Sequence, residues 1–395
     1  MKVANIIIVT HWTGGDVYPF IKIGLALKNQ KHEVTVITHC CYEKDVKDRG
    51  LAFAALDDEN EYEEFINDFP LLADAVKNLQ GVQYFNEKYY SSPRIMKEVG
   101  IISKYCNRTD TILIARHRSS ISALLVAEKY GFPVVPVLLA PNYLSHMDFH
   151  EEIMGKDMCE KINQSRTLLG LPLINSWKDW LLSPPTFIAA WPEWYAEVDY
   201  RLCPDVHFIG FITEKTNEET ELDPEIEHLL NSKKTVALIT GGTSKMLNPD
   251  FYKISAEACF EAGFSGILVT AYDQYIPKPL PEGIIHRNNL NLNLYLPKVN
   301  MVIHHGGIGT ITEAIISGTP QIILPHLADR PDNALRIQSF GIGLSFPPKK
   351  WVPKKMADSM KRFLEGNYKE KCEFYKSKLI NQDVSAELKK VIEKF

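Results

Sequence analysis

The stretch 302-VIHHGGIGTITEA-314 places a short apolar strand, a pair of glycines and the start of a helix in direct succession. Glycines let the backbone approach a ligand, and the free N–H groups of a first helical turn carry the positive end of the helix dipole. His305 and Thr310 add side-chain donors there, and Glu313 lies one turn beyond Gly309 on the same side of the helix. The pattern predicts a site for a nucleoside diphosphate, with the carboxylate on the ribose. A glycine-rich strand-to-helix connection without a ligand is the alternative.

The rest of the second half repeats the alternation of strand and helix. A polar, acidic stretch at 216–223 predicts a linker, and the apolar positions of the last 30 or so residues have helical spacing, which predicts terminal helices. Besides the run at 301–304, short apolar runs that predict strands lie at 235–240, 266–270, 283–287 and 321–324.

The first half begins with another strand, glycine turn, helix and strand. Residues 3–10 and 33–38 are continuous apolar runs typical of buried parallel strands, with a turn at Thr13–Asp16 and a helix at 20–28 between them. The rhythm returns at 111–115, 121–130 and 134–139, whereas 60–100 predicts irregular helices and loops. We predict two α/β domains, 1–213 and 214–375, with 376–395 as a helix that packs back on the first domain.

Composition and charge narrow the class of protein. The chain has 395 residues, 45% of them hydrophobic and 24% charged, with a net charge of -5, which indicates a globular protein without a nucleic-acid partner. The first residues indicate a buried strand rather than a signal peptide, and 132–141 is too short for a membrane helix. The seven cysteines form no Cys-x-x-Cys pair, so we expect reduced thiols and a cytoplasmic location.

The sequence predicts no metal site. It contains neither a His-Glu-x-x-His nor an Asp-x-Asp pattern. One polar stretch holds several possible ligand types, but without a regular spacing, and we expect no metal there: His146, Asp148, His150, Glu151 and Glu152.

Together these motifs resemble the inverting nucleotide-sugar glycosyltransferases of the GT-B fold, which include macrolide, glycopeptide, rhamnolipid, sterol and plant small-molecule enzymes. The resemblance rests on His305–Thr310, Glu313, Pro325 and Asp329 in the family's order and spacing, and on the Gly-Asp-Val-x-Pro start at 15–19. The stretch 204–211 resembles the end of the family's first domain. The resemblance implies two facing Rossmann-like domains with parallel sheets.

The resemblance also implies roles for the donor side. His305 and Thr310 would hold the diphosphate, Glu313 the ribose and Asp329 the hydroxyls of the transferred sugar, while 241–243 would form a second phosphate loop. The full set of predicted donor-binding residues is Gly15, Gly242, Thr243, His305, Gly307, Gly309, Thr310, Glu313, Asp329 and Arg330.

Two departures from the family pattern leave the donor open. Arg330 stands where glutamine is usual; it could bind an acidic sugar or form a salt bridge with Asp329 or Asp332. Asn289 and Leu292 stand where relatives carry residues that stack on the base, so the choice between UDP, dTDP and another nucleotide stays open.

The predicted catalytic base is Asp16, which occupies the family's base position on the first loop. The alternatives are that Asp16 caps the following helix and that His11 is the base. Arg116, His117 and Arg118 stand where many relatives carry a carboxylate that orients a histidine base. These cations would meet an anionic acceptor or form a solvated basic loop.

The resemblance implies a hexosyltransferase that moves a sugar from a UDP- or dTDP-sugar onto a hydroxyl of a small acceptor, such as a natural product, by single displacement with inversion. The acceptor would lie in the cleft between the domains, and no metal or other cofactor is required. The alternatives are a non-catalytic sugar-nucleotide binder, a lipid-linked cell-wall transferase and a nucleotide-sugar epimerase. A dehydrogenase is disfavoured because Thr13–Asp16 lacks the Gly-x-Gly-x-x-Gly spacing, and acidic residues among the tail lysines disfavour a membrane contact.

Overall fold

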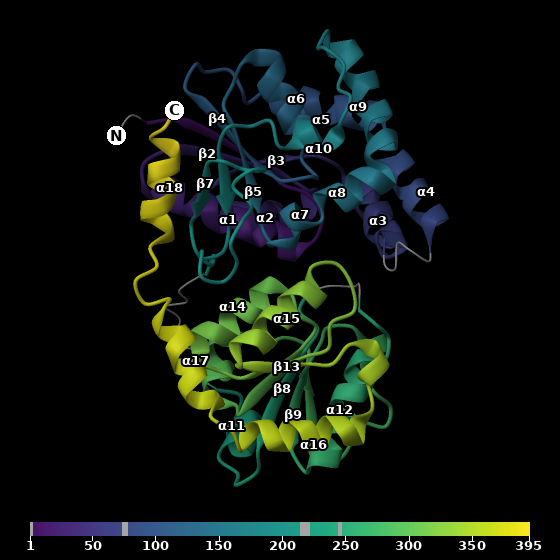
Figure 1. Cartoon of the computed structure of the whole chain (residues 1–395), viewed down its shortest axis with the longest axis vertical. Coiled ribbons are helices and arrows are strands. Elements are labelled where there is room, and N and C mark those ends of the chain that lie inside the picture. Colours follow the sequence, from purple (N-terminus) through teal and green to yellow (C-terminus); the bar gives the residue numbers. More distant parts are fainter. Residues whose placement is uncertain (1–2, 73–77, 214–221, 244–246) are drawn as a thin grey trace. The chain divides into compact units, whose positions relative to one another are not determined.

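The computed structural model describes residues 3–72, 78–213, 222–243 and 247–395. Contacts between Cα atoms divide the chain into two compact units. The first unit comprises 1–212 together with 383–395, and the second comprises 213–382 (Figure 1). Most of the predicted linker at 216–223 lies outside the described residues.

The first unit is built on a seven-stranded sheet with the order β3-β2-β1-β4-β5-β6-β7, in which all neighbouring strands run parallel. The strands at the centre of the sheet are buried along their whole length, as expected for a parallel sheet covered on both faces. The strands are β1 (Asn5–Val9), β2 (Glu33–Thr38), β3 (Ala52–Ala55), β4 (Thr111–Arg116), β5 (Val134–Leu138), β6 (Phe187–Ala189) and β7 (Val206–Phe208).

Helices cover this sheet, and the helix at 92–103 packs Ile95, Val99 and Ile102 into one core with residues of the central strands. The sequence prediction of irregular structure at 60–100 is wrong for most of this region, because capped regular helices pack their apolar faces there. The helices are α1 (Gly14–Asn29), α2 (Glu43–Asp48), α3 (Glu59–Asp68), α4 (Leu79–Tyr89), α5 (Ser92–Ser103), α6 (Ile121–Tyr130), α7 (Asn142–Ser145), α8 (Met147–His150), α9 (Lys156–Leu169), α10 (Trp177–Leu181) and α18 (Val384–Ile392).

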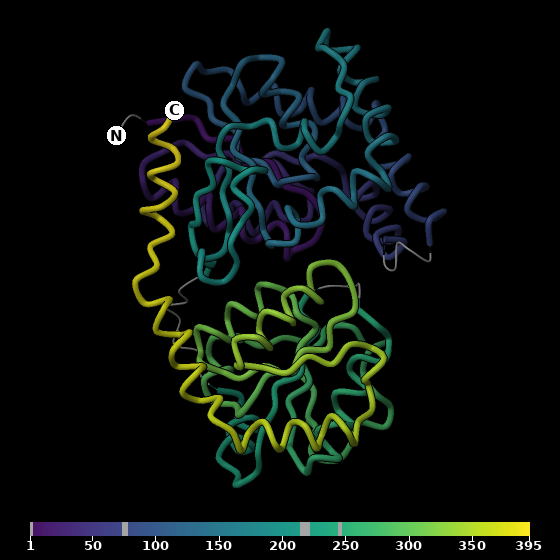
Figure 2. Tube along the Cα trace, in the orientation of Figure 1, coloured from purple at the N-terminus to yellow at the C-terminus, as the bar shows by residue number. Residues whose placement is uncertain are grey.

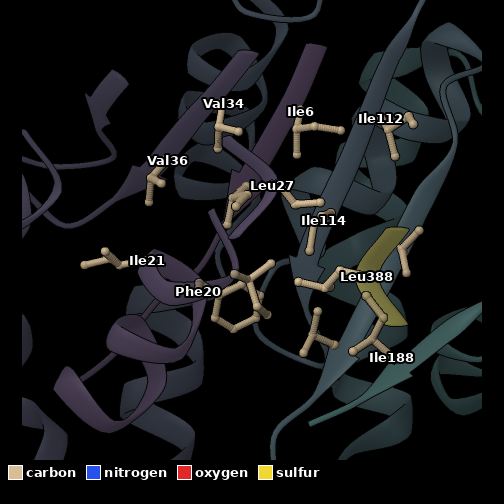
Figure 3. Close-up of a cluster of buried hydrophobic side chains, with 14 of the residues drawn as sticks. Ile6, Phe20, Ile21, Leu27, Val34, Val36, Ile112, Ile114, Ile188 and Leu388 are labelled. Atoms are coloured by element: carbon tan, nitrogen blue, oxygen red, sulfur yellow. The ribbon is translucent and has the colours of Figure 1, made fainter. Parts of the chain in front are cut away.

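The last helix belongs to the core of the first unit. Leu388 on α18 is fully buried beside Phe20 of α1 and Ile188 of β6 (Figure 3). Figure 2 shows this end of the chain, in yellow, next to the purple start. Burying a leucine of this kind contributes about 2 kcal/mol, so α18 is an integral part of the first unit.

The second unit repeats the architecture with a six-stranded parallel sheet in the order β10-β9-β8-β11-β12-β13. Its strands are β8 (Val236–Thr240), β9 (Ser265–Val269), β10 (Ile284–Arg287), β11 (Met301–His304), β12 (Gln321–Ile323) and β13 (Gly343–Ser345). Its helices are α11 (Pro224–Leu230), α12 (Phe251–Ala262), α13 (Leu292–Tyr295), α14 (Ile308–Ser317), α15 (Arg330–Phe340), α16 (Pro353–Leu364) and α17 (Tyr368–Ser377).

The predicted fold class, two α/β domains with parallel sheets, is confirmed. The sequence missed the strands β3, β6, β7 and β13, which have three or four residues each and therefore show little periodicity. Among the described residues, no helix is both long and apolar enough to cross a membrane.

Candidate functional site

Both sheets reverse their strand order at one point, between β1 and β4 in the first unit and between β8 and β11 in the second. In open α/β sheets, ligands bind outside the carboxyl ends of the strands at such a switch point. The segments that sequence analysis selected follow these strands, at 10–16 and 116–118 in the first unit and at 241–243 and 305–310 in the second. The topology therefore gathers the predicted residues at two sheet edges, one in each unit.

The second switch point is formed by a tight glycine turn between β11 and α14. Gly306 has φ of +94°, a conformation that favours glycine, and a Cβ there would lie 3.0 Å from Ile323 and 3.1 Å from the Arg330 carbonyl oxygen. His304 accepts a hydrogen bond from the Gly306 N–H at Nδ1 (3.1 Å), while its Nε2 is 3.0 Å from Oε1 of Gln321. Burial lowers the pKa of His304 to about 4, so this neutral histidine holds the turn in place.

His305 is buried at the same turn, and the structure shows no hydrogen-bond partner for its Nδ1 among the described residues. Burial, together with the nearby Arg330 and His304, lowers the pKa of His305 well below its ordinary value. A neutral imidazole with an unused ring nitrogen beside a helix N-terminus is suited to donate a hydrogen bond to an anion.

Two predicted glycines pack directly on the His305 ring. A Cβ at Gly242 would lie 2.9 Å from Cε1 of His305, and one at Gly307 would lie 2.5 Å from Nε2. The 241–243 loop and the 305–310 loop therefore meet at this imidazole. The sequence selected these glycines for backbone approach to a phosphate, and the structure adds a second reason, the space for the ring.

The remaining predicted donor residues lie on α14 and at the start of α15. Thr310 is buried and Gly309 exposed in the first turn of α14, while Glu313 is half-buried one turn later. Asp329 precedes α15 and accepts a hydrogen bond from Nδ2 of Asn333 (2.7 Å). Gly15 belongs to the first unit, where it is exposed in the first turn of α1.

Asn333 is a site residue that sequence analysis did not select. Its side chain is fully buried, and Nδ2 also donates to the carbonyl oxygen of Gly306 at 3.1 Å. The amide thus ties the glycine turn to Asp329. Asp332, one suggested partner of Arg330, instead pairs with Arg336 one turn along α15 (3.1 Å).

At the first switch point, Asp16 lies in the first turn of α1, one turn later than a cap residue. Thr13 is the cap, and Oδ2 of Asp16 accepts hydrogen bonds from the Thr13 backbone N–H (3.3 Å) and hydroxyl (3.1 Å). The predicted glycine turn is thus the beginning of the helix. The Asp16 side chain keeps 16% of its surface exposed, so an acceptor can reach its carboxylate.

The cation that faces Asp16 is Arg116, at the end of β4. Its Nη2 and Nε donate to Oδ1 of Asp16 at 2.7 and 3.1 Å, and the guanidinium lies 4.2 Å from the centre of the Trp12 ring. The interpretation of 116–118 as a solvated basic loop is wrong for Arg116 and His117, because each is 1% exposed. The neighbouring strands β1 and β4 bring Arg116 and Asp16 together across 100 positions of sequence.

His11 has the carboxylate partner that the sequence did not reveal. Its Nε2 lies 3.1 Å from Oε2 of Glu98 on α5, and its Nδ1 lies 3.2 Å from the Ser120 hydroxyl, which itself donates to the Val9 carbonyl oxygen. Burial opposes ionisation, but His11 and Arg94 outweigh it and hold the pKa of Glu98 below its ordinary value. Both ring nitrogens of His11 therefore already lie within hydrogen-bond distance of a side-chain oxygen.

A cavity of about 30 Å³ adjoins this network, lined by His11, Trp12, His39, Phe65, Glu98 and Ser119 among others. A space of this size holds an ordered water but not a sugar acceptor. His39 in its wall pairs with Asp57 (2.5 Å) and accepts from the Trp12 N–H (2.9 Å). His11, Glu98, His39 and Asp57 therefore form a hydrogen-bonded polar cluster behind the first switch point.

Backbone strain also concentrates at the switch-point loops. Of the four described non-glycine residues with positive φ, Trp12 and Arg118 follow β1 and β4, and Ala328 precedes Asp329. Such conformations cost about 1–3 kcal/mol each and cluster at functional sites. Among the described residues, no group of three or more His, Cys, Asp or Glu side chains could hold a metal ion.

Family models match part of each unit. The glycosyltransferase family 28 N-terminal domain matches 6–147, and the erythromycin biosynthesis protein CIII-like C-terminal domain matches 266–394. The sterol 3-beta-glucosyltransferase of Debaryomyces hansenii is 24% identical over 390 residues, covering 86% of this chain but only 24% of that protein. The chain thus spans about a quarter of that relative's length.

Solved structures share the whole fold. The glycotransferase of kitacinnamycin superposes with a TM-score of 0.79 at 16% identity, covering 100% of this chain and 99% of the other. The glycosyltransferase VinC in complex with dTDP gives a TM-score of 0.69 at 18% identity, with 99% and 100% covered. At these identities the likeness establishes the fold.

Proposed function

We propose that this chain, a member of the GT-B glycosyltransferases, transfers a sugar from a UDP- or dTDP-sugar to a hydroxyl of a small-molecule acceptor such as a natural product. The observation that carries the proposal is the pair of switch points. One presents neutral donors and backbone N–H groups, and the other presents a reachable carboxylate. These are the two requirements of glycosyl transfer to a hydroxyl.

On the donor side, the diphosphate would lie over the first turn of α14. His305 would donate from the ring nitrogen that lacks a partner, and Thr310 and the backbone N–H groups at 307–309 would complete the set. Glu313 would accept from the ribose hydroxyls, and Asp329, held by Asn333, from the hydroxyls of the sugar. The structure of VinC with dTDP supports a nucleotide of this kind.

On the acceptor side, Asp16 would act as the general base. The acceptor hydroxyl gives its proton to the Asp16 carboxylate while its oxygen attacks the anomeric carbon. The bond from that carbon to the diphosphate breaks, and the configuration inverts in a single displacement. The N–H groups and His305 stabilise the negative charge that develops on the departing diphosphate.

Asp16 is preferred to His11 because of what each group already binds. Both nitrogens of His11 are engaged and the residue is buried, whereas Asp16 is partly exposed with Arg116 and Thr13 fixing its orientation. In this proposal Arg116 positions the base, and the His11–Glu98 pair supports the loop. Charge stabilisation by protein donors alone accounts for the reaction, so we propose that no metal is needed.

The testing experiment is calorimetric titration of the protein with UDP-, dTDP- and GDP-sugars, neutral and acidic, without and with a chelator. We expect one donor to bind with micromolar Kd regardless of the chelator, and an acidic sugar would assign Arg330 to the sugar. Transfer to a panel of small hydroxyl acceptors is then followed by NMR, which should show inverted anomeric configuration.

Retention of configuration would contradict the single displacement. Donor binding without transfer or donor hydrolysis would instead favour a non-catalytic sugar-nucleotide binder. The cytoplasmic location, which the composition suggested, stays a prediction.

A further inference from the structure

Arg118 lies two residues after Arg116 and is held in an unfavourable backbone conformation. Its φ is +71°, in the left-handed region where glycine or asparagine is normally found. A turn that needed only this backbone shape would be more stable with glycine. The arginine side chain is therefore the feature that requires explanation.

The guanidinium of Arg118 is held between aromatic rings. It lies 5.8 Å from the centre of the Tyr143 ring on α7 and 5.9 Å from that of Trp177 on α10. Arg118 as a residue is half-buried. Stacking on aromatic faces fixes the plane of a guanidinium and leaves its N–H edge available.

The part of the chain that the structure describes gives Arg118 no carboxylate partner. Within the described ranges, none lies within ion-pair distance of its guanidinium. The acidic residues around this edge already have partners: Asp16 with Arg116, Glu98 with His11 and Arg94, Asp148 with Lys178, and Glu151 with the backbone N–H groups of Trp177 and Lys178.

The histidines near Arg118 do not change the net charge around it. Burial and the two arginines lower the pKa of His117 to about 3, and burial and Arg118 lower that of His150 to about 4, so both are neutral. Burial and the charge of Arg116 also lower the pKa of Arg118 itself. This edge therefore carries one uncompensated positive charge.

We infer that Arg118, framed by Tyr143 and Trp177, binds an anionic oxygen group of the acceptor, and that the acceptor is a hydroxylated carboxylic acid. A guanidinium binds a carboxylate through two parallel hydrogen bonds. Arg116 donates a hydrogen bond to the Tyr143 hydroxyl (3.0 Å) and also holds Asp16, so the acid group and the reacting hydroxyl belong to one compact molecule. This inference rests on the proposed function, because Asp16 defines the position of the hydroxyl.

The test measures the binding of small anions beside Arg118 and does not require catalysis. The protein is labelled with 5-fluorotryptophan, and the fluorine resonance of Trp177 is assigned by its loss in Trp177→Phe. Benzoate, neutral benzamide and inorganic phosphate are then titrated separately. We expect benzoate to shift the Trp177 resonance saturably and to bind at least about tenfold more tightly than benzamide, because benzamide cannot form the charged hydrogen-bonded pair.

Arg118→Gln should abolish the preference for benzoate, and Arg118→Lys should retain part of it. The matched control is Arg201→Gln, since Arg201 is 89% exposed and pairs with Asp199 away from this edge. The melting temperature of Arg118→Gln should equal or exceed that of the unmodified protein, because a strained, uncompensated cation is removed. A merely structural arginine would give a lower melting temperature.

Equal binding of benzoate and benzamide, or an unchanged preference in Arg118→Gln, would overturn the inference. Tighter binding of phosphate than of benzoate would replace the carboxylic acid by a phosphorylated acceptor. Failure of the proposed function would show separately, as the absence of nucleotide-sugar binding and of transfer to any hydroxyl acceptor, acidic or neutral.

Discussion

The two switch points share one topology but differ in chemistry. The edge formed by β1 and β4 is charged, with Asp16, Arg116, Arg118, His11 and Glu98 in or beside ion pairs. The edge formed by β8 and β11 presents glycine backbone and neutral histidines. A group that moves a proton needs charged neighbours to orient it, whereas a doubly charged phosphate is bound well by N–H dipoles that carry no net charge. The same sheet topology thus serves either proton transfer or phosphate binding, depending on the residues that follow its central strands.

The largest effect should come from removing the proposed base. We expect Asp16→Asn to lower kcat about 10³-fold, within the range for general-base catalysis, while nucleotide-sugar affinity stays nearly unchanged. Transfer rates and calorimetric titration measure the two quantities separately.

That variant also leaves the buried Arg116 charge without its partner, which can cost about 3–5 kcal/mol of stability. The control is therefore the double variant Asp16→Asn with Arg116→Met, which should regain the melting temperature but not the activity. Recovery of transfer in the double variant would show that Asp16 is structural, and an equal loss of transfer in His11→Gln with normal stability would move the base to His11.

The next largest effect should come from the glycine turn of the second unit. Gly306→Ala should cost about 2–4 kcal/mol, because alanine is strained at φ of +94° and its Cβ meets Ile323 and Arg330. Urea unfolding measures the loss.

Gly309→Ala separates folding from ligand approach at the same helix start. A Cβ there meets no atom within 4 Å, so the variant should be at least as stable as the parent protein. We expect it nevertheless to bind the nucleotide about tenfold more weakly, because the methyl group stands where the diphosphate approaches. Unchanged affinity would place the diphosphate elsewhere.

Acidification should weaken both edges in the same direction. Burial holds the pKa of His304 at about 4 and, with the two arginines, that of His117 at about 3, below the value of about 6.5 in an unfolded chain. Between pH 6.5 and 4 the unfolded chain binds more protons, so stability falls as the pH falls, by up to about 1.4 kcal/mol per pH unit for each such histidine. Urea midpoints across this range measure the slope. His304→Gln should reduce the slope of stability against pH by about 1.4 kcal/mol per pH unit. Replacing the exposed His228 should leave the slope unchanged.

The smallest expected effect is at the ribose. Glu313→Ala should weaken nucleotide binding about tenfold, equivalent to about 1.4 kcal/mol, without affecting the acceptor side. Glu261→Ala, on the exposed face of α12, is the matched control. Equal affinities for the two variants would remove Glu313 from the nucleotide site.

The two edges also differ in how far the sequence predicts them. The donor edge is largely local: 302–314 was predicted to contain a strand, a turn and the start of a helix, and the structure has β11, the glycine turn and the start of α14 there. The acceptor edge depends on distant residues, since Arg116 is 100 positions from Asp16 and Glu98 is 87 from His11. No periodicity encodes such pairs, and even at the donor edge Asn333 was missed because its two partners lie on different loops.

By itself, the sequence determined the class of fold and the location of the glycine turn between β11 and α14, because apolar runs, helix starts and glycine conformations depend on neighbouring residues. Only the tertiary structure decided which charges meet. The order of the strands places β1 beside β4, and this adjacency joins Arg116 to Asp16 while leaving Arg118 uncompensated. Ion pairing depends on distance in space, and that distance is set only when the sheet has formed.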